Sequence, residues 1–143
     1  MNNVLVINKK SNFELFEASP EKNVRDYAHE DSKAAEKVRL SHAENSKTID
    51  TVVAGLEQLG IAHKEIYRGD LEEAAESIEN YDLIITVGGD GTLLEVSHYI
   101  ANVPLLGVNS DTERSTGFYS AANRSNFVEI MQGIEQMPKN TLS

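Results

Sequence analysis

A short apolar segment, residues 83–87, runs directly into the sequence Gly-Gly-Asp-Gly-Thr at 88–92. An unbroken run of β-branched and apolar residues is typical of a strand buried on both faces, as in a parallel sheet. The residues after the glycines, from Leu93 to Ala101, are expected to form a helix. This strand–turn–helix unit restricts the chain to an α/β fold in which a ligand can approach the glycine backbone closely.

Strand and helix patterns alternate along the rest of the chain. Strands are expected at 4–7, 62–67, 82–87 and 105–108, and helices at 32–45, 46–59, from Asp70, at 93–101 and at 125–136. Such alternation predicts an α/β fold with a three-layer parallel sheet, in one domain over residues 1–143. Ligands of such sheets bind at the carboxyl ends of the strands, which here are the loops after Ile7, Val87 and Val108.

Several helix ends carry recognisable signals. Ser46 or Thr48 can cap the start of the second long helix, and Gly60 can end it. Asp70 and Glu73 have the spacing of a capping box, in which the first side chain accepts a bond from a backbone N–H of the helix. These signals predict separate helices on either side of residue 46 and a helix that begins at Asp70.

The composition excludes several classes of protein. With 23 acidic and 13 basic residues the formal charge is −10, which argues against binding to nucleic acid, where clustered basic groups neutralise phosphates. No apolar run is long enough to span a membrane, and the start of the chain does not look like a secretory signal. The absence of cysteine excludes disulfides and thiolate chemistry and suits a cytoplasmic protein.

The glycine-rich turn has the features of a phosphate site. Its glycines leave room for a ligand, and the helix that follows directs free N–H groups and a positive dipole toward the turn. The alternative is a tight connection without a ligand. Asp90 is the notable residue, because a carboxylate in an anion-binding turn is costly unless it meets a metal or takes a proton from a substrate hydroxyl. Otherwise Asp90 caps the helix.

Thr92 also has two interpretations. Its hydroxyl can contact a phosphate or a metal, or it can form a capping box with Glu95 three residues later. The second interpretation gives Glu95 a structural role. The segment is neither a Walker loop, which needs Gly-Lys-Ser/Thr, nor the spaced dinucleotide fingerprint.

The segment at 88–92 matches the Gly-Gly-Asp-Gly-Thr signature shared by NAD kinases and by diacylglycerol and sphingosine kinases, with a close variant in phosphofructokinases. Residues 104–110, Pro-Leu-Leu-Gly-Val-Asn-Ser, and Gly-Phe-Tyr at 117–119 resemble what NAD kinases carry after this helix. Asn-Ser-Asp-Thr-Glu-Arg-Ser at 109–115 looks like the mitochondrial-type branch. The chain therefore resembles the N-terminal domain of NAD kinases over most of its length, which implies their Rossmann-like, phosphofructokinase-like fold.

The resemblance implies a role for each matching residue of the glycine turn. Asp90 would accept the proton of the 2′-hydroxyl on the adenosine ribose of NAD, and Gly91 would lie against the bound nucleotide. Gly88, Gly89 and Thr92 would cradle the phosphates of ATP.

Other residues carry weaker implications. Phe118 matches the aromatic residue beside the NAD adenine, where stacking is reasonable, or it is a core residue. Asn109 can hydrogen-bond a ligand or cap its turn. Arg114 can contact phosphate or pair with a neighbouring carboxylate, and Lys9 and Lys10 can bind phosphate or stay solvated.

Two departures from the family pattern leave alternatives open. Glu95 stands where many NAD kinases have a basic residue and lipid kinases often have glutamate. NAD kinases also place a β-rich domain with an Asn-Glu motif after this region, and the sequence reaches Ser143 without one, so we expect a fragment that is inactive alone. The alternatives are a diacylglycerol-type lipid kinase domain and a non-catalytic nucleotide-binding module.

The ligands implied by the resemblance are ATP as the donor, NAD as the substrate and a divalent cation such as Mg²⁺. A homo-oligomer is implied in the same way, because NAD kinase active sites are often completed across subunits. The four histidines show no spacing typical of a metal site, so we expect surface or packing roles for His29, His42, His63 and His98.

Overall fold

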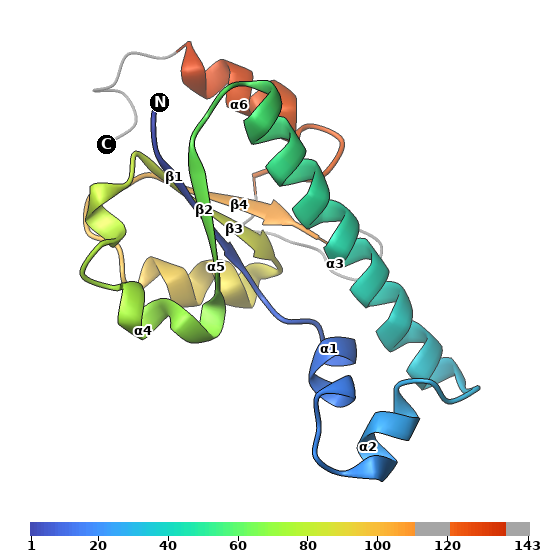
Figure 1. The fold of residues 1–143 in the computed structure, drawn as a ribbon. Helices are drawn as coiled ribbons and strands as arrows, with labels where there is room; N and C mark the ends of the chain where they lie inside the picture. Colours follow the sequence, from blue (N-terminus) through green and yellow to red (C-terminus); the bar gives the residue numbers. More distant parts are fainter. Residues whose placement is uncertain (111–120, 137–143) are drawn as a thin grey trace.

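The two strands with the longest apolar runs occupy the centre of a four-stranded parallel sheet with the order β2-β1-β3-β4 (Figure 1). This computed structural model describes residues 1–110 and 121–136. All residues of β1 (Val4–Asn8) and β3 (Leu83–Gly88) are buried, as their composition predicts. β2 (His63–Tyr67), which carries more polar residues, lies at one edge, and β4 (Leu105–Asn109) lies beside β3.

The strand register brings three loop starts to one edge of the sheet. Asn8 at the end of β1 pairs with Val87, and Gly88 at the end of β3 pairs with Asn109 at the end of β4. All pairings are parallel, so the loops that follow these strands leave the same edge. The predicted parallel sheet is confirmed, and its carboxyl edge is the one at which a ligand was expected.

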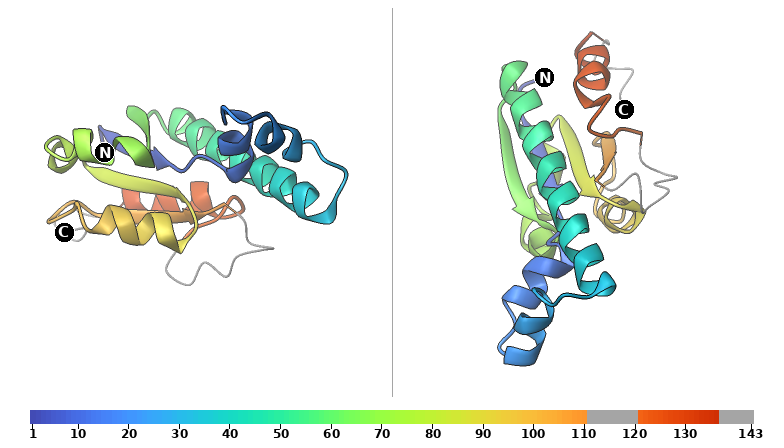
Figure 2. Two further views of the ribbon diagram at one scale, coloured as in Figure 1. Left: turned by 90° about the horizontal axis from the view of Figure 1, so that it is seen from below. Right: turned by 90° about the vertical axis from the view of Figure 1, so that its right-hand side faces the viewer.

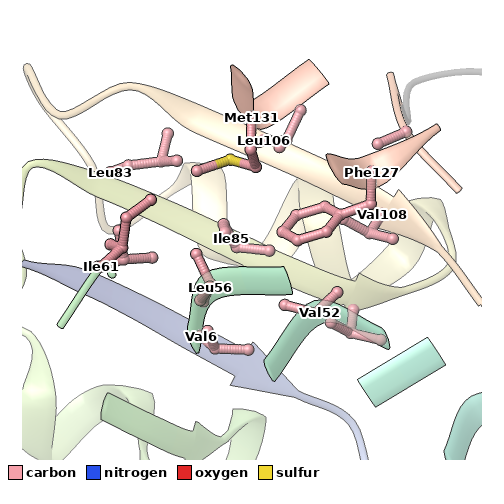
Figure 3. Packing of buried hydrophobic residues seen from close by; sticks show 13 residues of the cluster. Val6, Val52, Leu56, Ile61, Leu83, Ile85, Leu106, Val108, Phe127 and Met131 are labelled. Carbon is pink, nitrogen blue, oxygen red and sulfur yellow. The ribbon is translucent and has the colours of Figure 1, made fainter. Parts of the chain in front are cut away.

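Helices cover both faces of the sheet, so the predicted three-layer architecture is confirmed. On one face, α3 (Lys33–Gln58) and α6 (Phe127–Glu135) bury apolar side chains against β1, β3 and β4 (Figure 3). On the other face, α4 (Leu71–Ala74), the 3-10 helix η2 (Ile78–Asn80) and α5 (Asp90–Ser97) contribute Leu71, Ile78 and Val96. The alternation of side chains along β3 supplies both cores.

The two long helices expected at 32–45 and 46–59 are one continuous helix of 26 residues, α3, so the predicted break is wrong. Thr48 does not cap a helix start, because its hydroxyl donates to the Glu44 carbonyl 2.8 Å away within the helix. The true start is capped by Ser32, which accepts from the Ala35 N–H. The predicted end is confirmed, since Gly60 has φ of 70° and the hydrogen bonds of a Schellman motif form around it.

Two helices were not expected from the sequence, and two other helical expectations need correction. Residues 8–31, which show little pattern, contain α1 (Asn12–Glu17) and α2 (Lys22–Tyr27), which lie at the N-terminal end of α3 (Figures 1 and 2). The helix expected from Asp70 is broken into the 3-10 turn η1 (Arg68–Asp70), α4 and η2, and Asp70 makes no side-chain capping bond. α5 begins at Asp90 rather than Leu93 and ends at Ser97.

One close contact between helices makes a testable prediction. A Cβ placed on Gly55 of α3 would lie 2.9 Å from Cε2 of Phe127 and 3.2 Å from Cγ2 of Val128 on α6. Leucine at this position forces the two helices apart, so Gly55→Leu should lower the free energy of unfolding by about 1–3 kcal/mol in urea denaturation.

The matched control is Gly133→Leu in α6. Nothing lies within 4 Å of a Cβ placed there, so only helix propensity changes, and we expect a gain of roughly 0.5–1 kcal/mol. Equal effects of the two substitutions would contradict the close packing of α3 on α6.

Candidate functional site

A cavity of about 440 Å³ opens at the carboxyl edge of the sheet. The loops after β1, β3 and β4 form one side, and the N-terminal half of α3 forms the other. The described residues that line it are Lys9, Ser11, Asn12, Lys37, Val38, Ser41, Asn45, Gly88, Gly89, Asn109 and Ser110. The expectation that the three loops meet is therefore confirmed.

Gly88 has a conformation that other residues rarely adopt. Its φ is 151°, and a Cβ placed on it would lie 3.0 Å from Oγ1 of Thr92. Gly89 is the N-cap of α5, whose first N–H groups have no acceptors within the helix. Backbone donors and two glycines thus stand together at the cavity, an arrangement that suits a phosphate group.

The remaining residues of the glycine turn lie along the first turn of α5. Asp90 is the first residue of the helix and is partly buried, Gly91 is exposed and Thr92 is buried. None of these residues is among those that line the 440 Å³ cavity. Gly88, Gly89 and Asn109 do line it, so the cavity gathers part of the expected site and α5 carries the rest.

Thr92 and Glu95 do not form the expected capping box, because both lie inside α5. Glu95 instead forms an ion pair with Arg68 of η1, and Nη1 of Arg68 lies 3.5 Å from the Thr92 hydroxyl oxygen. The structural role predicted for Glu95 thus has a different physical basis: the residue joins α5 to the segment after β2.

This ion pair should contribute little to stability, because its side chains are 35% and 37% exposed. We expect Glu95→Gln to lower the free energy of unfolding by about 0.2–1 kcal/mol at low salt. The difference should shrink in roughly 1 M salt, where exposed charges are screened. Urea denaturation at two salt concentrations measures both, with Glu65→Gln on β2 as a control, because Glu65 is exposed and lies outside any helix. A loss that is unaffected by salt would contradict a solvent-screened pair.

The two lysines after β1 lie in different surroundings. Lys9 lines the 440 Å³ cavity and also a second cavity of about 470 Å³, between η1, α5 and α1. Lys10 lines only the second, where its Nζ lies 5.0 Å from the centre of the Tyr67 ring. Lys9 is therefore the lysine of this pair that lies beside the glycine turn.

Sequence reasoning missed the contribution of α3 to the cavity. Lys37, Ser41 and Asn45 recur every four residues, so they share one face of the helix. This polar stripe is the sequence pattern from which the role of α3 as a cavity wall could have been predicted. Asn8 was missed as well: it is 4% exposed, and its Oδ1 has no hydrogen-bond partner among the described residues.

Some expected site residues cannot be placed. Phe118 and Arg114 lie outside the described residues.

Asn109 and two of the histidines are described and have hydrogen-bond partners. Asn109 is buried, and its N–H donates to the Ala122 carbonyl at 2.8 Å. Of the histidines, His42 bonds the hydroxyl of Ser11 at 2.7 Å, and His29 pairs with Glu17 at 2.9 Å.

The fold and this edge define a parallel α/β protein with a glycine turn, suited to an anion, between a buried strand and a helix. The chain belongs to the ATP-NAD kinase family, because the family model "ATP-NAD kinase N-terminal domain" matches residues 6–138.

Curated relatives agree with this assignment. The chain is 42% identical over 87 residues to "NADH kinase" of Arabidopsis thaliana, an alignment that covers 50% of this chain and 26% of the relative. It is 35% identical over 103 residues to "Probable NADH kinase" of Oryza sativa subsp. japonica, covering 61% and 31%. "NAD kinase 2, mitochondrial" of Homo sapiens is 32% identical over 78 residues, covering 53% and 17%. The predicted family, with its mitochondrial-type likeness, is confirmed.

The aligned parts span less than a third of these three relatives. Within residues 1–110 and 121–136, no helix has the length and apolarity needed to cross a bilayer.

Proposed function

We propose that the protein transfers the terminal phosphoryl group of ATP to the 2′-hydroxyl of the adenosine ribose of NAD, giving NADP. The observation that carries this proposal is the glycine turn, set at the carboxyl edge of a parallel sheet in a member of the ATP-NAD kinase family. Backbone N–H groups and a helix start suit phosphates, and phosphoryl transfer depends chiefly on positioning and charge stabilisation.

Asp90 is the proposed proton acceptor. As the ribose oxygen forms its bond to the terminal phosphorus, its proton moves to the Asp90 carboxylate, and the bond between that phosphorus and the ADP oxygen breaks. Gly91, which is exposed beside Asp90, is proposed to lie against the nucleotide.

The other assignments follow the same logic. Gly88 and Gly89 would hold donor phosphates through backbone N–H groups. Thr92 is buried with its hydroxyl close to Gly88, and we propose that this hydroxyl contacts a donor phosphate at the turn. Asn109 at the end of β4 would hydrogen-bond a nucleotide, and Phe118 would stack on the NAD adenine.

Mg²⁺ is the cation that we propose to accompany ATP. No three His, Asp or Glu side chains gather as a metal cluster in the described part of the chain. Mg²⁺ commonly keeps several waters and binds through substrate phosphates and one or two carboxylates. The ion would be held by the phosphates of ATP and by water and would neutralise phosphate charge, while Asp90 stays the proposed proton acceptor.

The test is NADP formation from NAD, ATP and magnesium by the full-length gene product, with NADH as a parallel acceptor because two plant relatives are named NADH kinases. We expect turnover with at least one acceptor. Nucleotide binding without turnover of either would establish the non-catalytic module, and transfer only to diacylglycerol would establish the lipid kinase.

The residues 1–143 are proposed as the nucleotide-binding domain of that protein. Because positioning by a single domain supplies only part of what catalysis requires, we expect negligible activity from this chain alone. A cytoplasmic location and a homo-oligomeric state are further proposals. Cell fractionation tests the first, and light scattering of the purified gene product tests the second.

A further inference from the structure

The described residues that line the cavity beside the glycine turn carry positive charge, although the chain is strongly acidic. Lys9 and Lys37 are the charged side chains among the described residues that line it, and no carboxylate is among them. The chain as a whole carries a formal charge of −10. Within the described part of the chain, two lysines without a carboxylate in the lining are therefore a local exception, and they favour an anionic ligand.

Both lysines are available to a ligand. Their side chains are exposed, and neither forms an ion pair with a described residue. Lys47, three turns further along α3, does pair with a carboxylate, that of Glu44 at 3.9 Å. Lys9 and Lys37 are thus not held by a carboxylate among the described residues, although Lys9 also lines the second cavity.

The fold defines where the backbones of Lys9 and Lys37 lie relative to the cavity. A Cβ placed on Gly88 would lie 3.8 Å from the Cβ of Lys9, so the stem of Lys9 adjoins the glycine turn. Nδ2 of Asn45 donates to the Lys9 carbonyl at 3.3 Å, which ties the β1 loop to α3. Lys37 lies two helical turns before Asn45 on the same face of α3. Lys37 therefore approaches the cavity from the side that α3 forms.

We propose that Lys9 and Lys37 bind the polyphosphate chain of the phosphoryl donor in this cavity, facing the backbone of Gly88 and Gly89. The inference rests on the proposed function and adds donor-binding residues to it. A lysine ammonium on a flexible stem neutralises phosphate as a point charge, while the glycine N–H groups supply directed bonds.

The experiment uses the full-length gene product and the variants Lys9→Gln and Lys37→Gln. Each should raise the KM for ATP by about tenfold or more, because a charge-assisted hydrogen bond is lost, and leave the KM for NAD within about twofold. Lys33→Gln is the matched control, since Lys33 lies on α3 one turn before Lys37, is exposed and does not line the cavity. Lys37→Arg should retain most of the affinity for ATP.

Calorimetric titration gives a readout that does not depend on turnover. ATP and inorganic tripolyphosphate are titrated in parallel into each variant at fixed ionic strength. If the variants bind both ATP and tripolyphosphate more weakly than the wild type, the cavity recognises the phosphate chain of either ligand. If tripolyphosphate does not bind the wild type and the variants bind ATP more weakly, the cavity is specific for the nucleotide donor. Unchanged affinity for ATP in both variants, or a selective rise in the KM for NAD, overturns the inference.

The two proposals fail in different ways. A wild-type protein that forms no NADP contradicts the proposed function whatever the lysine variants do. A wild-type protein that forms NADP, with lysine variants that behave like Lys33→Gln, contradicts only the donor site. Thermal melts of the variants should match the wild type, because the substituted side chains are exposed.

Discussion

Asp90→Asn is expected to lower the rate of NADP formation by about 10²–10⁴-fold, the range for loss of a positioned proton acceptor. Asparagine has nearly the same shape and cannot take the proton of the attacking hydroxyl. Because Asp90 is the first residue of α5 and asparagine is well tolerated at helix starts, the fold should be retained. Turnover with saturating ATP and NAD measures the effect, and circular dichroism checks the fold.

The control for this variant is Asp50→Asn. Asp50 is exposed on α3, so the same chemical change should leave turnover within about twofold. Full activity of Asp90→Asn would remove Asp90 from the mechanism, although the phosphate site at the glycine turn could still stand. A loss of activity together with a loss of helical signal would instead indicate a structural role for Asp90.

Phe127→Ala is expected to cost about 3–5 kcal/mol in the free energy of unfolding. The Phe127 side chain is 0% exposed and lies in the core formed by α3, α6 and the sheet, as Figure 3 shows. Its ring contacts the position of Gly55, where a side chain would clash with it. Truncation therefore leaves a cavity at the contact between two helices, which cannot close without moving one of them.

Urea denaturation of the wild type and the variant measures this difference. Phe127→Leu, which refills part of the volume, should lose less than half as much. Leu94→Ala is a second control, since Leu94 is 48% exposed on α5 and its truncation should cost less than about 1 kcal/mol. A small effect of Phe127→Ala would mean that α6 contributes little to the stability of the sheet.

Much of the fold was predictable because local patterns are strong where strands are buried on both faces. The run at 83–87 identified β3, and the short run at 4–7 identified β1, both central in the sheet. Gly60 ended α3 as predicted, because a positive φ is a local requirement that glycine meets. The continuity of α3 through residue 46 was missed, since its polar N-terminal half gave no apolar period to follow.

The candidate site likewise has one part that the sequence predicts and another that only the structure reveals. The glycine turn could be found from the sequence, because its residues are consecutive and their chemistry is local. Lys37, Ser41 and Asn45 could not be joined to that turn without knowing that α3 runs past the carboxyl edge of the sheet. Similarly, the pairing of Glu95 with Arg68 depends on where η1 meets α5, which no spacing along the chain reveals.

The sequence by itself determined the parallel α/β fold, the glycine turn and the family, since each rests on residues that are neighbours in the chain. Only the tertiary structure decided which lysine lies beside the glycine turn, which helix face forms the cavity wall and why a side chain at Gly55 would clash with α6. The physical reason is that these features depend on how helices pack against the sheet, and packing joins residues by shape and charge rather than by their order in the chain.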